Sequence, residues 1–135
     1  MVGVIIISES NACKEMLKTV GKVLNRDRLP GIYPLVLDAS YTIEERLNKI
    51  QALINKADVG QGVLIMTELY GASQTNVCKH FLKGNHVKVL CGYNLPMIIE
   101  AVTLNESAAL GDICNLTAEV GKKYIRCPAC EQNCT

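Results

Sequence analysis

Three polar loops contain the residue types that could bind an anion or move a proton. They span residues 8–11, 67–76 and 92–96, and each lies between an apolar run and a helical pattern. A loop that leads into a helix presents free backbone N–H groups and a partial positive charge, which favour an anion such as phosphate. Gly71 and Ser73 fit a turn that would cradle a phosphate group, whereas Glu9 adds a carboxylate to the first loop. Taken singly, each loop is equally compatible with an ordinary cap or turn.

A second group of chemically active side chains is found near the end of the sequence. Cys127, Cys130 and Cys134 form a C-x₂-C-x₃-C pattern, and a C-x₂-C pair is a common two-thiolate unit for zinc or an iron–sulfur cluster. Three thiolates leave a fourth ligand to be supplied by another group. The alternatives are a redox dithiol and a tail with reactive but functionless thiols.

The pattern between these groups predicts alternating strands and helices. Strands are expected over residues 2–7, 32–37, 63–66 and 87–91, and each is followed by a segment with helical spacing of apolar residues. Such alternation predicts an α/β fold with three α/β/α layers around a mostly parallel central sheet of four to five strands. We expect one domain over residues 1–126 and a cysteine-containing tail over residues 127–135. The three polar loops then meet at the carboxyl edge of the sheet, where ligands bind in such folds.

Several element boundaries follow from local signals. Ser10 or Asn11 is expected to cap the helix over residues 12–24. Residues 42–45 (TIEE) form a capping box for the second helix, and Pro34 indicates that its strand lies at a sheet edge. Gly121 is expected to end a last helix over residues 107–120, before a short strand at residues 124–126.

Composition narrows the classes of function. The 135 residues carry a net charge of +1 with one Phe and no Trp, so neither a basic surface nor a base-stacking platform is expected, and we predict no nucleic-acid binding. No apolar run has the length of a membrane span and no export signal is present, so we expect a cytoplasmic protein without membrane insertion. Seven cysteines without an export signal disfavour a disulfide framework. Four of them lie in apolar segments and are expected to act as small hydrophobic residues: Cys13, Cys78, Cys91 and Cys114.

Three segments together resemble the mannose/fructose-type enzyme IIA domain of the bacterial sugar phosphotransferase system. They are GVIIISESNACKEML, GVLIMTELYGASQTN and CGYNLPMIIEAV, and the similarity covers roughly residues 1–125. The resemblance implies a cytoplasmic α/β domain that forms a homodimer by exchanging a C-terminal strand. It also implies phosphoryl transfer from the phosphocarrier HPr to an enzyme IIB, with no required cofactor.

The resemblance also implies that the phosphoryl acceptor is missing. The family usually has S-H-G-N-x-A after the first strand, and Glu9 stands at the position of its acceptor histidine. The supporting aspartate of the family corresponds to Glu68, and its Gly-Gly-Ser-Pro corresponds to residues 71–74 (GASQ). The anion site implied by the family would be formed by Ser10, Gly71, Ala72 and Ser73.

Glu9 and Glu68 would then face one crevice, and several roles stay open. A carboxylate can accept a phosphoryl group as an acyl phosphate, or supply a permanent negative charge that partly imitates a phosphorylated histidine. The two carboxylates could form an acid/base pair for hydrolysis, or Glu9 could be a solvated loop residue. Two close carboxylates repel, so one tends to hold a proton, a cation or a basic side chain.

From these observations we predict an enzyme IIA-like component that cannot carry a phosphoryl group on histidine and instead regulates HPr-like, enzyme IIB-like or regulator partners by binding. The alternative is a metal- or redox-responsive protein that uses the cysteine tail on a dimeric enzyme IIA-like scaffold.

Overall fold

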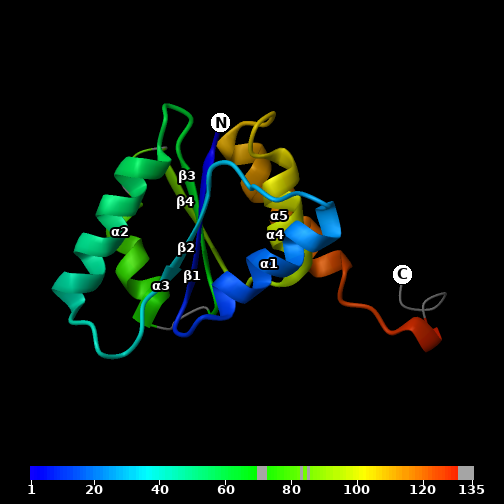
Figure 1. Cartoon of the computed structure of the whole chain (residues 1–135), viewed down its shortest axis with the longest axis horizontal. Coiled ribbons are helices and arrows are strands. Elements are labelled where there is room, and N and C mark those ends of the chain that lie inside the picture. Colours follow the sequence, from blue (N-terminus) through cyan, green and yellow to red (C-terminus); the bar gives the residue numbers. More distant parts are fainter. Residues whose placement is uncertain (70–72, 83, 85, 131–135) are drawn as a thin grey trace.

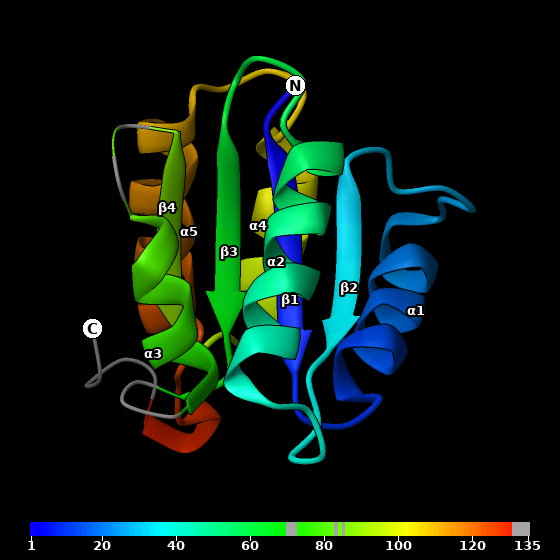
Figure 2. The same ribbon diagram turned by 90° about the vertical axis from the view of Figure 1, so that its left-hand side faces the viewer.

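The fold is built on a single parallel sheet. The computed structural model describes residues 1–69, 73–82, 84 and 86–130, and only the backbone of Cys130. The described strands have the order β2-β1-β3-β4, and every neighbouring pair is parallel (Figure 2). They are β1 (Gly3–Ser8), β2 (Ile32–Val36), β3 (Val63–Thr67) and β4 (Val87–Cys91). This confirms the predicted parallel sheet, and β2, which contains Pro34, lies at an edge as expected.

Helices cover both faces of the sheet and complete the predicted three layers (Figure 1). The described elements are α1 (Ala12–Leu24), α2 (Ile43–Ala57), α3 (Ser73–Cys78), α4 (Leu95–Leu104) and α5 (Leu110–Lys123), with short 3₁₀ turns η1 (Lys79–Phe81) and η2 (Pro128–Cys130). Helices α1, α4 and α5 pack on one face, and α2 and α3 pack on the other.

Strand β1 separates two apolar cores because its side chains alternate between the faces. Val4 and Ile6 pack in the core beneath α1, α4 and α5, whereas Ile5 and Ile7 pack in the core beneath α2. All four side chains are fully buried. Burial of each such side chain stabilises the fold by about 1.5–3 kcal/mol. Strand β1 is therefore firmly held in the core, and the polar loop that follows it starts from a fixed position.

The predicted capping box at the start of α2 is confirmed. The Thr42 hydroxyl accepts from the Glu45 backbone N–H at 3.1 Å, and Glu45 Oε1 accepts from the Thr42 N–H at 3.1 Å.

The expected helix stop at Gly121 is wrong, because α5 continues to Lys123 and Gly121 lies inside it. A side chain at this position would meet α4. A Cβ atom built on Gly121 would lie 2.6 Å from Met97 Sδ and 2.7 Å from Met97 Cγ. Gly121 therefore permits close packing between two helices and does not serve as a C-cap.

The expected strand over residues 124–126 is also wrong for the structure of the single chain. Tyr124 forms a turn after α5, and no strand is assigned to residues 125–127. A strand needs a neighbour for its backbone hydrogen bonds, and here the chain leads away from the sheet instead (Figure 1).

The four cysteines of the folded part divide into two pairs. Cys13 and Cys78 are buried as expected, whereas Cys91 and Cys114 are only half-buried. Burial raises the pKa of the Cys78 thiol to about 12 and also raises that of Cys114. Both thiols are therefore protonated at neutral pH.

Candidate functional site

The elbow after β1 is shaped by Ser8, whose side chain is buried at the end of the strand. Its hydroxyl donates to the carbonyl oxygen of Ser10 and accepts from the backbone N–H of Cys13 at 3.0 Å. The predicted cap is therefore corrected. Asn11 makes no side-chain cap hydrogen bond, and Ser10 Oγ accepts from the Ala12 N–H only at 3.4 Å. Ser8, the last residue of β1, takes this role.

Glu68, in the loop after β3, is hydrogen-bonded to the loop after β1. The two loops therefore meet at the carboxyl edge of the sheet, as expected. Glu68 Oε1 accepts from the backbone N–H of Glu9 at 2.7 Å, and the Gln74 side-chain amide lies 3.4 Å from the same oxygen. Glu9 itself is exposed, and Glu68 is half-buried. The Glu68 carboxylate thus binds the backbone of the elbow.

The loop after β3 is held by two buried threonines. Thr75 Oγ1 donates to the Leu69 carbonyl at 2.6 Å. Because a hydroxyl has one proton, Thr75 Oγ1 accepts in its second hydrogen bond, and Thr67 Oγ1 donates to it at 2.6 Å. Ser73 begins α3 and is exposed. Gly71 and Ala72 lie outside the described residues, so the anion cradle stays a prediction.

The third loop contributes Tyr93. Its hydroxyl donates to the Ile7 carbonyl at 3.1 Å, which ties this loop to β1. Burial raises the pKa of the Tyr93 phenol, and the nearby Glu68 carboxylate raises it further. Tyr93 is therefore neutral at physiological pH. Asn94 caps α4 by accepting from the Met97 N–H at 3.1 Å, and its amide donates to the Gly121 carbonyl at 3.1 Å.

A cavity of about 580 Å³ lies where these loops meet, hereafter the elbow cavity. It is lined by Glu9, Ser10, Ala12, Met16, Glu68, Leu69, Gln74 and Tyr93. The structure thus brings together three of the residues singled out in the sequence, Glu9, Ser10 and Glu68, whereas Ser73 does not line the cavity. Sequence analysis missed Tyr93, Gln74 and Met16. Tyr93 could have been found, because it stands in the third polar loop.

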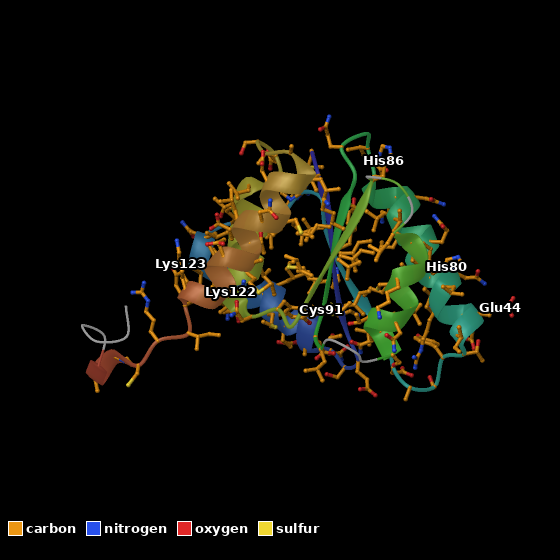
Figure 3. All side chains as sticks on the ribbon, turned by 180° about the vertical axis from the view of Figure 1, so that it is seen from behind. Glu44, His80, His86, Cys91, Lys122 and Lys123 are labelled. Atoms are coloured by element: carbon orange, nitrogen blue, oxygen red, sulfur yellow. The ribbon has the colours of Figure 1, made fainter. Side chains whose placement is uncertain are left out.

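Neither histidine of the chain lines the elbow cavity. His80 lies in η1, and His86 precedes β4, at the opposite edge of the sheet from the elbow (Figure 3). Both are exposed. The described residues of the elbow cavity therefore offer two carboxylates, two hydroxyls and an amide, and no imidazole.

The cysteine tail is described only in part. Cys127 is exposed, the Cys130 backbone lies in η2, and Cys134 falls outside the described residues. Within the described ranges, no group of three or more His, Cys, Asp or Glu side chains could hold a metal ion. The zinc or iron–sulfur site, and the metal- or redox-responsive function built on it, stay predictions.

Solved structures identify the architecture. An EIIA component from Streptococcus agalactiae superposes with a TM-score of 0.84 at 19% identity, covering 96% of this chain and 98% of that one. A PTS IIA protein associated with the fucose utilization operon of Streptococcus pneumoniae has a TM-score of 0.83 at 20% identity, covering 98% and 100% of the two chains. The fold is therefore that of IIA-type domains.

The family follows from the sequence match. The family described as the PTS system fructose IIA component matches residues 3–117, and the chain belongs to it. A curated relative is the PTS system mannose-specific EIIAB component of Escherichia coli strain K12, which is 23% identical over 127 residues. That match covers 93% of this chain and 39% of the relative, so the chain corresponds to about two fifths of the longer protein. Across the described parts of the chain, none of the helices combines the length and apolar character needed to cross a membrane.

Proposed function

We propose that this chain is an enzyme IIA-like component of the mannose/fructose-type sugar phosphotransferase system that carries no phosphoryl group on histidine and acts in the cytoplasm by binding partner proteins. One observation carries the proposal. The elbow cavity, at the carboxyl edge where the family places its acceptor, contains Glu9 and Glu68 and no histidine.

The chemistry of the elbow supports loss of phosphoryl transfer. A neutral imidazole nitrogen attacks phosphorus without charge repulsion, whereas a carboxylate repels the incoming phosphoryl oxygens. Glu68 adds a second negative charge beside Glu9 and is already hydrogen-bonded to the Glu9 N–H at 2.7 Å. Tyr93 contributes a neutral phenol, and among the described residues that line the cavity there is no Lys or Arg to offset the two carboxylates.

Glu9 instead acts as a fixed negative charge at the position where the family would carry a phosphorylated histidine. The charge is exposed on a loop that is anchored by two hydrogen bonds, one to the Ser8 hydroxyl and one to the Glu68 carboxylate. A carboxylate has one charge and fewer acceptor oxygens than a phosphoryl group, so it imitates that state only partly. Partners that recognise the phosphorylated state of a IIA domain, either enzyme IIB-like or regulatory, would therefore bind constitutively.

HPr-like proteins would meet the same face of the molecule but could not pass on a phosphoryl group. The domain would thus bind an HPr-like protein without completing phosphoryl transfer.

The proposal includes a homodimer formed along β4. This strand pairs only with β3 among the described strands, so its outer edge has unpaired backbone groups. The chain beyond α5 exposes two large apolar side chains, Tyr124 at 68% and Ile125 at 79%. A second copy that pairs residues 124–126 with β4 would cover both.

Light scattering tests this dimer. The wild-type chain should have a dimer mass and Ile125→Asp a monomer mass, and a wild-type monomer at all concentrations would contradict the dimer.

A Glu9→His variant tests the proposed partner set. The variant is incubated with phosphoenolpyruvate, enzyme I and HPr, and its intact mass is measured at neutral pH. We expect a phosphoryl adduct on the variant, because the scaffold and docking face of the family would be retained. Failure of the folded variant to gain a phosphoryl group would contradict retention of the HPr docking face.

A further inference from the structure

A second cavity borders the other side of α1 and has no counterpart in the proposed function. It has a volume of about 620 Å³, and its lining comes from α1, the segment that follows it and the edge strand β2. Figure 2 shows that α1 and β2 are neighbours. Its lining comprises Lys14, Leu17, Lys18, Gly21, Lys22, Asn25, Arg26, Asp27, Leu29, Ile32 and Pro34. We call this cavity the lysine groove.

One wall of the lysine groove is a stripe of positive charge. Lys14, Lys18 and Lys22 are spaced four residues apart, so they lie on one side of α1, and all three are exposed. Like charges at this spacing destabilise a helix. Lys18 pairs with Glu15 at 2.9 Å, but no carboxylate in the described chain lies within 4.0 Å of Lys14 or Lys22.

The charge at the far end of the groove is partly balanced. Arg26 lies 3.6 Å from Glu106, and Asp27 is the only acidic residue among the described residues of the lining. The lining therefore contains four basic residues and one acidic residue. Charge complementarity with an acidic partner is the physical consequence.

The floor of the groove is apolar. Leu17, Leu29 and Pro34 are half-buried, and they leave part of their apolar surface open between the charged wall and the edge strand. Pro34 has no backbone N–H, which discourages addition of another strand to β2. The groove thus suits side chains laid across it better than a β-strand paired with the edge.

The end of α1 fixes the shape of the groove. Asn25 adopts the left-handed conformation with φ 52°, and the Arg26 N–H donates to the Gly21 carbonyl at 2.9 Å. This arrangement is a Schellman motif, and it turns the chain back toward β2.

We propose that the lysine groove binds an acidic segment of a partner protein, with carboxylates on Lys14 and Lys22 and an apolar side chain on the floor formed by Leu17 and Leu29. None of the described residues that line the groove is aromatic, which argues against single-stranded nucleic acid as the ligand. The inference is independent of Glu9 and of phosphoryl transfer, because it concerns the other side of α1.

The test uses a labelled peptide of alternating Glu and Leu as the probe, with Glu–Gly and Lys–Leu peptides as controls. We expect the Glu–Leu peptide to bind the full chain and to shift the backbone NMR signals of α1 and residues 29–34. Binding should weaken as salt is added. Inorganic phosphate and single-stranded DNA should produce smaller shifts at the same concentration.

Two matched double variants locate the binding. Lys14→Ser with Lys22→Ser should raise the Kd of the Glu–Leu peptide about five- to tenfold, as expected for two exposed ion pairs. Lys122→Ser with Lys123→Ser removes the same charge from the end of α5, which packs beside β4, whereas α1 packs beside β2 at the other edge of the sheet (Figure 2), and it should leave the Kd unchanged. Circular dichroism checks that both variants fold.

Several outcomes would overturn the inference. They are equal binding of the Glu–Gly peptide, shifts centred outside the lysine groove, equal weakening in the two double variants, and tighter binding of phosphate or DNA than of the peptide. Absence of peptide binding by the wild-type chain would overturn it as well.

Discussion

Replacing Gly121 by alanine should destabilise the protein, although alanine is the better helix former. The added methyl group would lie 2.6 Å from Met97 Sδ and 2.7 Å from Met97 Cγ, inside van der Waals contact. Met97 is 5% exposed, so its side chain cannot swing into solvent to make room. Overpacking of this kind costs about 1–3 kcal/mol, and the gain in helix propensity returns at most about 1 kcal/mol.

The expected net loss is about 1 kcal/mol in the free energy of unfolding, measured by urea denaturation with wild type as reference. Gly111→Ala is the matched control because it lies in the same helix and a Cβ there meets nothing within 4 Å. It should stabilise the protein by about 0.5 kcal/mol.

A double-mutant cycle isolates the contact. Met97→Ala alone should cost about 2–5 kcal/mol, and in that background Gly121→Ala should no longer destabilise. The reasoning would be refuted if Gly121→Ala stabilised the wild-type protein as Gly111→Ala does.

Two further predictions concern the pH dependence of stability and the cysteine tail. Backbone N–H groups of Gly60 and Gly62 lower the pKa of Asp58, so its contribution is present above its ordinary pKa of 3.8 and is lost as the pH falls through the lowered folded value. Asp58→Asn should therefore flatten the fall in unfolding free energy on acidification below about pH 4, and an unchanged acid limb would contradict this. If the tail binds zinc or an iron–sulfur cluster, protein purified without oxygen should contain metal that is lost in Cys127→Ser, whereas a metal-free wild-type chain would count against that site.

Much of the fold could be predicted because its signals are local. The β-branched run of β1, the capping box at Thr42 and the proline in β2 each dictate backbone geometry within a few residues. The meeting of Glu9 with Glu68 also followed, since parallel strands place their carboxyl ends at one edge.

The roles that were predicted wrongly or missed are set by contacts outside the local sequence pattern. Gly121 has the sequence signature of a helix stop, but its role is set by Met97 on another helix. Ser8 was placed in the polar loop, and the cap was expected at Ser10 or Asn11, but Ser8 ends β1 and its hydroxyl caps the turn into α1. Tyr93 was placed in a polar loop, but its hydrogen bond to Ile7 spans 86 positions in the sequence and has no local signature.

The central claim is that the elbow carries a fixed charge in place of a phosphoryl acceptor. The most direct measurement is the intact mass of the wild-type chain after incubation with phosphoenolpyruvate, enzyme I and HPr at neutral pH, beside Glu9→Gln. The account predicts that neither protein gains a phosphoryl group. An adduct on the wild-type chain that disappears in Glu9→Gln would contradict it, because Glu9 would then be a working carboxylate acceptor.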